Sequence, residues 1–499
     1  MADATSKVKA SGAINEPSPP EYSRSCKDII FAILFLIVVG VTIYFAASFG
    51  ATYISETQIQ DVKKTTGFMV ILNYGGISGA IAIGISLLWI LTMMFVGECI
   101  IWASIAFMIL ANVFAAVYMT QRLHERGDAH YWWPAAVFGT IALLILLYAV
   151  CIRHRVKFAA VHLHVAGKAI FRLPFTLVVA LVMVGVQLAW AITCIVGTFG
   201  LLHHQGAIAL SDGCAHNATF ATCRVKVQYG QALGLLIPIL LVFFWGAMVI
   251  KNILAVTVSG TVANWKVNAA APMITVVAWG RALTVNLGSI CFGSLIVAIL
   301  ETIQTVLAGI SYAAQQSGNC VAACIVGCLA CLIGVIKSWM ETFNRFAYAY
   351  VGIHGYSFLK AGHKVSKMFA SKGWSAIAND DLTQKVFFLG NLVVGTLACF
   401  LTIQVASAHL KEDPQLFAGL KKPEAMIGVL GFLIGYVINN LFMSLMASAV
   451  STIFVLWAED PAGWQATQPD HYAKLHAAWL NIYPDEYNNG VGKPETSQV

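Results

Sequence analysis

The sequence predicts an all-α integral membrane protein, a polytopic bundle of about ten transmembrane helices with both termini in the cytoplasm. Composition is the first observation behind this fold class, because 59% of the 499 residues are hydrophobic and only 11% are charged. Soluble domains contain roughly 25% charged residues. Charges this sparse cannot cover the surface of a water-soluble protein of this size, so the chain is expected to lie in a membrane.

Long apolar runs are the second observation. A helix needs roughly 20 mostly apolar residues to cross the hydrocarbon core of a bilayer, and ten windows of the chain meet this requirement. The run 67–120 is too long for one helix, so we expect a turn near Val96-Gly97-Glu98 that divides it into two spans. The ten expected spans lie near 28–50, 68–94, 98–120, 133–152, 175–199, 229–256, 284–308, 320–340, 386–407 and 425–457.

The positions of lysine and arginine are the third observation, and they set the orientation. Cytoplasmic loops of membrane proteins carry an excess of these residues. With the N-terminus inside, the inner segments and helix ends hold 21 of the 30 lysines and arginines, and the outer segments hold the other 9. Both termini are therefore expected in the cytoplasm.

The chain is expected to divide into a disordered cytoplasmic N-tail at 1–27, a transmembrane domain at 28–457 and a cytoplasmic C-tail at 458–499. The first 25 residues are polar and rich in Ser, Pro and Ala. They lack the apolar core and cleavage site of a secretory signal, and their composition is typical of disorder. No basic soluble module is present, so nucleic-acid binding is not expected.

One outer loop, 200–228, carries two features typical of an extracellular face. Cys214 and Cys223 lie nine residues apart and could form a disulfide on an oxidising side of the membrane. Asn217 begins an Asn-Ala-Thr sequon, the acceptor pattern for N-glycosylation. Both features fall on the side already expected to be outside.

Four cysteines at helical spacing in the eighth span, Cys320, Cys324, Cys328 and Cys331, resemble a set of metal ligands. Zinc and iron–sulfur sites usually draw their ligands from turns or from separate elements instead. We therefore expect these cysteines to be small packing residues, and we expect neither a metal site nor a cofactor.

Small residues four apart predict close contacts between helices in lipid. Because glycine also lowers helix stability, Gly288 and Gly293 could allow the seventh span to bend. The small-residue pairs are Gly75 with Gly79, Ser289 with Gly293, and Gly431 with Gly435.

Polar groups inside the spans are the candidate binding residues, because an ionisable side chain in the membrane is costly unless it faces protein or water. Glu301 is the strongest candidate, with Gln304 one turn further along the seventh span. Aromatic faces hold quaternary ammonium groups by cation–π attraction. The aromatic residues expected to join Glu301 are Trp245, Trp190, Tyr74 and Tyr229; as alternatives, each could be core filler or part of an interfacial belt.

Other polar residues have structural interpretations. Lys251 lies near an inner helix end, from which its ammonium group can reach water. The amides of Asn286, Asn439 and Asn440 are expected to form hydrogen bonds between helices.

The segment 341–364, ETFNRFAYAYVGIHGYSFLKAGHK, follows an apolar run but mixes aromatic with basic residues. Phe343, Phe346, Ala347, Tyr350 and Val351 share one helical face. Glu341 and Arg345 are spaced as an i, i+4 ion pair. This pattern predicts a helix that lies along the inner leaflet. The alternative is that the segment forms an inner gate.

The same segment carries a resemblance to a known family. KSWMETFNRFAYAYVGIHGYSFLKAG (337–362) resembles the signature of the choline transporter-like proteins, although His354 replaces the usual Tyr. Three further blocks are similar to that family: FWGAMVIKNILAVTVSGTVANW (244–265), RALTVNLGSICFGSLIVAI (281–299) and STIFVLWAEDP (451–461). The residues that match the family motifs are Asn344, Arg345, Tyr348, Gly355, Asn252, Gly288, Ser289, Gly293, Ser294, Glu459, Asp460 and Pro461.

The resemblance covers most of the chain from 27 to about 485, and the absence of a very long first outer loop makes it most similar to the Pns1-like branch. It implies a multi-pass protein of the plasma membrane, not an enzyme, that moves choline or a related organic cation, with proton exchange as a coupling mode. The implied partners are that small cation and the lipid bilayer, and the sequence sets no oligomeric state.

Two other functions stay open at this point. Basic and histidine-rich stretches in an inner loop, Arg153-His154-Arg155 and His162-Leu163-His164, would suit a membrane-embedded enzyme or lipid-handling protein, or simply contacts with anionic headgroups. A channel or scramblase is the third option, although no repeated pore loop supports it. No HExxH, GxSxG or Walker A motif is present to favour an enzyme or an ATP-driven pump.

Overall fold

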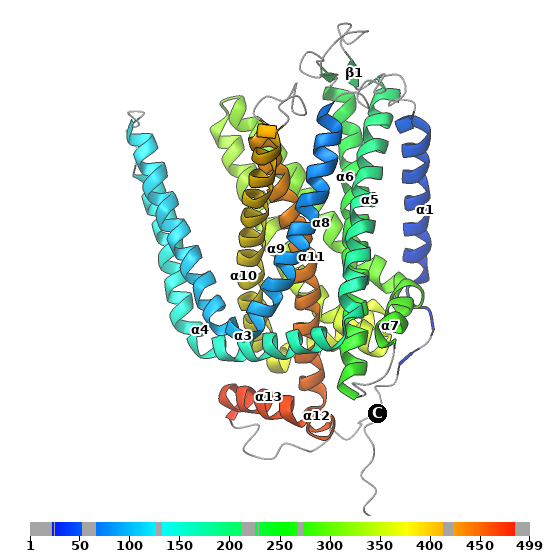
Figure 1. Ribbon diagram of the computed structural model, residues 1–499, viewed down its shortest axis with the longest axis vertical. Helices are drawn as coiled ribbons and strands as arrows, with labels where there is room; N and C mark the ends of the chain where they lie inside the picture. The colour runs from blue at the N-terminus through cyan, green and yellow to red at the C-terminus, as the bar shows by residue number, and fades with distance from the viewer. Residues whose placement is uncertain are drawn as a thin grey trace, which may run out of the picture.

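The computed structural model describes residues 22–484, except residue 24 and the segments 52–65, 126–131, 207, 211–224, 228, 268–272 and 413–422. The described chain is a bundle of long helices (Figure 1), as predicted. Its elements are α1 (Ile29–Phe45), the π-helix η1 (Ala46–Gly50), α3 (Thr66–Glu125), α4 (Trp133–Arg172), α5 (Phe175–His204), β1 (Ile208–Leu210), β2 (Val225–Val227), α6 (Tyr229–Val267), α7 (Ile274–Leu283), α8 (Leu287–Gln316), α9 (Cys320–His354), α10 (Phe358–Glu412), α11 (Pro423–Glu459), α12 (Pro461–Thr467) and α13 (Pro469–Ile482).

Nine helices of the described chain are long and apolar enough to cross a membrane, and one of them, Asn73–Glu125 within α3, has 53 residues, enough for two crossings. The backbone of α3 leaves helical geometry at Val96 (φ −121°, ψ 29°). Figure 1 shows α3 running down one side of the bundle and, after this bend, rising beside α4. The turn predicted at Val96-Gly97-Glu98 is therefore confirmed, and the bend turns nine helices into ten crossings.

The inner face, where the described chain both begins and ends, is covered by helices that do not cross the bundle (Figure 1). α7, α12 and α13 lie there together with the second half of α4. Trp464 and Trp479 of α12 and α13 are fully buried, because Trp479 packs edge-on against Phe158 of α4. The expected C-tail thus contributes to the folded structure as far as Ile482.

The outer loop between α5 and α6 contains a short antiparallel pair in which Ile208 lies opposite Val227. Cys214, Cys223 and Asn217 lie in the chain between these strands and outside the described residues. Their disulfide and glycan stay predictions.

The centre of the bundle is α11. Of its most apolar 18-residue window, 89% is buried, compared with 11% for the corresponding windows of the helix beginning at Ile29 and of α9. Small residues bring its neighbour close: a Cβ on Gly435 would lie 2.7 Å from the Cβ of Ala398 on α10. This contact is of the kind that the small-residue spacing predicts.

The four cysteines of α9 do not pack as expected, because Cys320, Cys324, Cys328 and Cys331 are all exposed. The contact with α8 is made one residue away, where Ala323 accepts a hydrogen bond from Ser311. The spacing was read correctly as helical, but it marks an exposed face of α9.

The prediction that 341–364 lies along the inner leaflet was wrong, whereas its alternative role as an inner gate stays a prediction. Its first part continues α9 through the core, and Phe346, Tyr348 and Tyr350 are each at most 3% exposed. The helix ends at Gly355, whose φ of +67° is a left-handed conformation that glycine adopts readily. The aromatic side chains therefore face other helices, not lipid headgroups.

Candidate functional site: a central cavity

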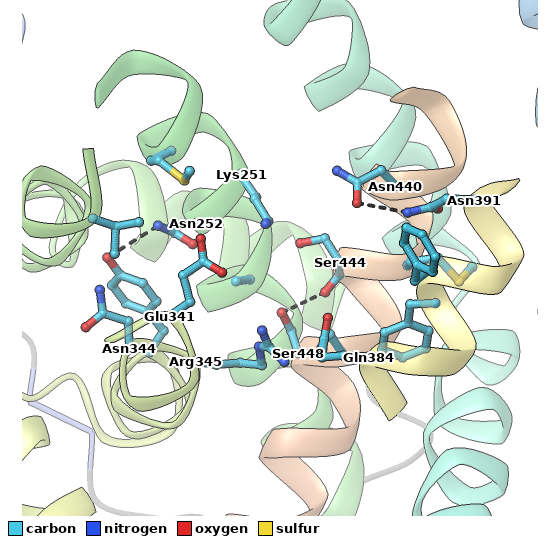
Figure 2. Close-up of a pocket in the computed structure, with 18 of the residues that line it drawn as sticks. Lys251, Asn252, Glu341, Asn344, Arg345, Gln384, Asn391, Asn440, Ser444 and Ser448 are labelled. Carbon is cyan, nitrogen blue, oxygen red and sulfur yellow. Dashed lines mark hydrogen bonds between the residues drawn. The ribbon is translucent and has the colours of Figure 1, made fainter. Parts of the chain in front are cut away.

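A cavity of about 230 Å³ lies among α6, α8, α9, α10 and α11 (Figure 2). On α10 its lining residues belong to the first turns of the span Leu382–His409, which places the cavity in the inner half of the bundle. Asn440 and Phe388 are exposed although they line it, so the cavity is open to its surroundings. The lining residues are Met248, Lys251, Asn252, Ala255, Val297, Glu341, Asn344, Arg345, Tyr348, Gln384, Phe387, Phe388, Asn391, Tyr436, Asn440, Met443, Ser444, Ala447 and Ser448.

One wall is a hydrogen-bond network built from residues of three family-like blocks. The amide of Asn252 on α6 donates to Ser294 Oγ at 2.9 Å and to the Tyr348 hydroxyl at 3.4 Å. Tyr348 in turn donates to the carbonyl oxygen of Ile290 at 3.2 Å. These bonds tie α6, α8 and α9 together where side chains must meet across three helices.

Gly293 allows this network to form. A Cβ at this position would lie 2.6 Å from the Tyr348 hydroxyl oxygen, and the Gly293 carbonyl accepts a 2.9 Å hydrogen bond from Asn344. The helix α8 is continuous through Gly293. The glycine therefore permits close approach, and the structure shows no bend of α8 at this residue.

Charged side chains of two kinds border the cavity. Arg345 forms an ion pair with Asp380, which also accepts a 3.0 Å hydrogen bond from Thr342. Arg345 therefore pairs with α10 and not with Glu341, in contrast to the i, i+4 pair expected from the sequence. Lys251 and Glu341 have no hydrogen bond or ion pair with any residue that the structure describes.

The opposite wall is made of amides and aromatic rings. Asn391 on α10 donates to Asn440 at 3.2 Å and accepts from Asn439 at 2.7 Å, both on α11. The interhelical hydrogen bonds predicted for Asn439 and Asn440 are therefore confirmed. Phe387 and Tyr436 add aromatic faces from α10 and α11. Figure 2 shows Asn391 and Asn440 across the cavity from Asn252 and Glu341, with Lys251 between them.

Glu301 does not line this cavity. Its carboxylate accepts a 2.6 Å bond from Lys337 on the neighbouring α9, and the two side chains are 23% and 20% exposed. Both residues lie 18 positions from Asn319 at the α8–α9 turn (319−301 and 337−319). Residues equidistant from a turn meet in an antiparallel hairpin, so the sequence did hold a signal for this pair.

Four of the other five predicted binding residues, Gln304, Trp245, Trp190 and Tyr74, do not line the cavity either. Gln304 lies over Gly334, with its amide nitrogen 2.8 Å from the site of a Cβ there. The indole of Trp245 donates to the Cys291 carbonyl, and that of Trp190 donates to the Phe243 carbonyl. The described chain thus gives both indoles a role in helix packing.

Tyr74 lies in a separate outer cluster with Ala406 and Ile427, and its hydroxyl is 2.8 Å from His409 Nδ1. Tyr229 begins α6, but its side chain lies outside the described residues. Substrate contact by all six predicted residues stays a prediction.

A second group of family-like residues holds the inner face together. The Asp28 carboxylate accepts a 2.6 Å bond from Ser289 Oγ and a 2.9 Å bond from the backbone amide of Phe358 at the start of α10. Gly288 packs directly on the backbone of Asp28, and Gly355 packs on that of Ser23. These glycines leave room for the chain that precedes α1.

The C-terminal block closes the inner end of α6. Asp460 accepts a 2.9 Å bond from Lys266 and caps α12 by accepting from the amide of Gly463, and Pro461 begins that helix. Burial acts to raise the pKa of Asp460, but the hydrogen bond and charge of Lys266 outweigh it, so this pKa lies below its ordinary value. Glu459 forms a 3.0 Å contact with His354.

The sequence interpretation missed the cavity because it treated Lys251 as a snorkelling residue and Glu341 as part of a surface helix. Asp380 was not singled out at all. A signal for this cavity was nevertheless present in the sequence, because both charges fall inside family-like blocks. Lys251 immediately precedes the motif residue Asn252, and Glu341 lies three residues before the motif residue Asn344.

Comparison with known proteins gives four consistent findings. A family model described as plasma-membrane choline transporter matches residues 136–462, more than half of the chain. Protein PNS1 of Debaryomyces hansenii is 27% identical over 357 residues, which cover 70% of this chain and 66% of that protein. For protein PNS1 of Mycosarcoma maydis the identity is 28% over 423 residues, 81% of this chain and 73% of that protein.

A CTL-like protein of Dictyostelium discoideum is 27% identical over 344 residues, 67% of this chain and 55% of that protein. The chain therefore spans about two thirds of the length of the Debaryomyces protein and just over half of the Dictyostelium protein. The family model includes every helix that lines the cavity.

Proposed function

The chain belongs to the choline transporter-like family, in its Pns1-like branch, and from this premise we propose that it is a secondary transporter that moves choline or a related organic cation across the plasma membrane. Family membership supports a membrane transporter, and we propose that the chain is not an enzyme. The identity of the substrate, the coupling to protons and the location in the plasma membrane are our proposals.

One observation carries the proposal: the central cavity is walled by the family-motif residues Asn252, Asn344, Arg345 and Tyr348. Binding sites of secondary transporters lie near the middle of the bilayer, between helices that meet side by side. A cavity in which motif residues from α6 and α9 converge is the place in the described chain where a small solute would meet them. We therefore assign the substrate site to this cavity.

Recognition of the cation follows from the groups at the walls. Glu341 supplies the only carboxylate among the lining residues, and Tyr348, Phe387 and Tyr436 supply aromatic faces. An ammonium group between a carboxylate and aromatic rings gains both ionic and cation–π attraction. Asn252 and Asn344 then hold a hydroxyl or other polar end of the solute.

Access from the inside is controlled, in this proposal, by the ion pair of Arg345 with Asp380. Asp380 lies one helical turn before Gln384 on α10, towards the inner end of that helix. Separation of this pair would part α9 from α10 below the cavity, so the two states differ in a defined contact. The 341–364 segment thus supplies the gate that was one of its two expected roles.

Proton exchange would use Glu341. Its carboxylate lines the cavity and has no ion-pair partner among the described residues. Uptake in one direction would then be accompanied by proton movement in the other.

The test is uptake of radiolabelled choline by a host that lacks its own choline transport. We expect saturable uptake above vector, stimulated by a pH gradient, and a loss of about tenfold or more in Asn252→Ala. Lack of uptake of both choline and ethanolamine by protein present at the cell surface would contradict the proposal. Lipid scrambling or ionic current under those conditions would favour a lipid-handling protein or a channel instead.

A further inference from the structure

The cavity contains two opposite charges that are not joined to each other. Lys251 comes from α6 and Glu341 from α9, and no ion pair within 4.0 Å links either of them to a residue that the structure describes. The other acidic groups at this depth are paired, Glu301 with Lys337 at 2.6 Å and Asp380 with Arg345. Since separated charges inside a membrane protein are costly, their retention points to a ligand.

Two neutral side chains at the cavity also have a hydrogen-bonding atom without a partner, one an acceptor and the other a donor. Asn344 is 3% exposed, and its side-chain oxygen has no partner although its nitrogen donates to Gly293. The side-chain nitrogen of Gln384 is also buried without a partner. The lining therefore offers acceptors from α9, namely Glu341 and Asn344, and donors from Lys251 and Gln384.

These groups are separated in space. Figure 2 shows Glu341 and Asn344 on one side, Gln384 with Ser444 and Ser448 on the other, and Lys251 extending between α6 and α11. A ligand that satisfies all of them must present a positive group to α9 and a negative group to Lys251. The arrangement is dipolar.

The charge balance leads to the same conclusion. The charges of Lys251 and Glu341 sum to zero, and Asp380 neutralises Arg345, so the empty site has no net charge. A simple quaternary ammonium alcohol would neutralise Glu341 and leave Lys251 without a counter-ion. A zwitterion leaves neither charge uncompensated.

Resting on the proposed function, we infer that the preferred substrate of this cavity is a small zwitterion, a molecule that carries an ammonium group together with a carboxylate or phosphate group. The ammonium binds Glu341 and the aromatic faces of Tyr348 and Tyr436. The anionic group binds the Lys251 ammonium and the Gln384 amide. Lys251 is then the residue that determines specificity.

The experiment measures binding of three probes to the purified full-length protein in nanodiscs by isothermal titration: choline, glycine betaine and phosphocholine. In the wild type we expect at least one of the two zwitterions to bind about tenfold or more tightly than choline. Lys251→Gln should abolish this preference: the zwitterions should bind about tenfold or more weakly, and choline should bind at least as tightly as in the wild type because the uncompensated lysine is gone. Lys251→Arg should keep the preference, and Glu341→Gln should weaken all three ligands.

The matched control is Lys360→Gln, the same change at an exposed lysine of α10 outside the cavity; it should bind like the wild type. Equal or tighter binding of choline in the wild type overturns this inference and leaves the proposed function standing. Absence of binding by all three probes, together with no choline uptake, overturns both. The wild-type ranking decides the matter even where Lys251→Gln does not fold.

Discussion

The bundle contains two lysine and glutamate pairs, one joined by an ion pair and the other not. In the α8–α9 hairpin, Lys337 and Glu301 are bonded at 2.6 Å. Around the cavity, Lys251 and Glu341 are left apart, and neither is paired with another described residue. The residue types are the same, so composition alone cannot tell the two sets apart.

The difference separates structure from binding. The two charges of a bonded pair neutralise each other, so the pair does not need a ligand. Charges without an ion-pair partner lower the stability of the ligand-free protein, and a ligand with opposite charges stabilises them. Glu301 was the expected binding residue because it is an isolated carboxylate in the sequence. The structure shows that isolation along the chain is not isolation in space.

The largest expected effect is a difference in transport rate between variants of Glu341 and variants of Glu301. Glu341→Gln removes the only carboxylate that lines the cavity, so choline uptake should fall by about 100-fold, equivalent to ~2.7 kcal/mol of transition-state free energy. Glu301→Gln should change uptake by less than about threefold once surface levels are matched. Initial uptake rates in the transport-deficient host measure both. The reverse order would return Glu301 to the binding site.

The next effect is on stability and should follow the bonded pair. Glu301→Gln leaves Lys337 uncompensated, which should lower the free energy of unfolding by about 1–3 kcal/mol, less than for a fully buried pair because both side chains are partly exposed. Adding Lys337→Gln should recover at least half of the loss. Thermal melting of the purified variants gives the comparison, and additive losses in the double variant would show that the pair is not coupled.

A smaller effect of opposite sign should follow the separated charges. Lys251→Gln removes an unpaired charge, so the ligand-free protein should be as stable as the wild type or more stable by up to about 1 kcal/mol. Lys337→Gln should instead be destabilised, because it leaves Glu301 without its partner. Melting temperatures of the two single variants decide this. A clear destabilisation by Lys251→Gln would mean that Lys251 has a structural role.

The smallest effect concerns the pair Lys266 and Asp460 at the inner face, where the Asp460 side chain is 54% exposed. The pKa of Asp460 lies below its ordinary value of 3.8. The stabilisation is therefore present above that value and is lost as the pH falls through it towards the lower folded-state pKa. Solvent screening limits the effect to less than about 1 kcal/mol. Melting at pH 6 and pH 3.5 should show a steeper loss in the wild type than in Asp460→Asn, and parallel curves would contradict this.

The ten crossings could be predicted because each depends on a local property, the length of an apolar run. Even the bend at Val96 followed from the excessive length of 67–120, and it is confirmed. The segment around Phe346 and Tyr350 was misplaced for the converse reason. An aromatic helical face is equally suited to headgroups and to a helix-lined core, and only its neighbours decide which one it meets.

The sequence by itself determined the membrane class, the number of crossings and the family, because hydropathy and motif order are written along the chain. The tertiary structure decided which charges find partners. Lys337 reaches Glu301 because the α8–α9 turn sets the two at one level, and Asp380 reaches Arg345 because α10 returns beside α9. Lys251 and Glu341 come from α6 and α9 and line the same cavity, but they form no ion pair within 4.0 Å in the described chain. Coulomb attraction acts over distances that only the packed helices define.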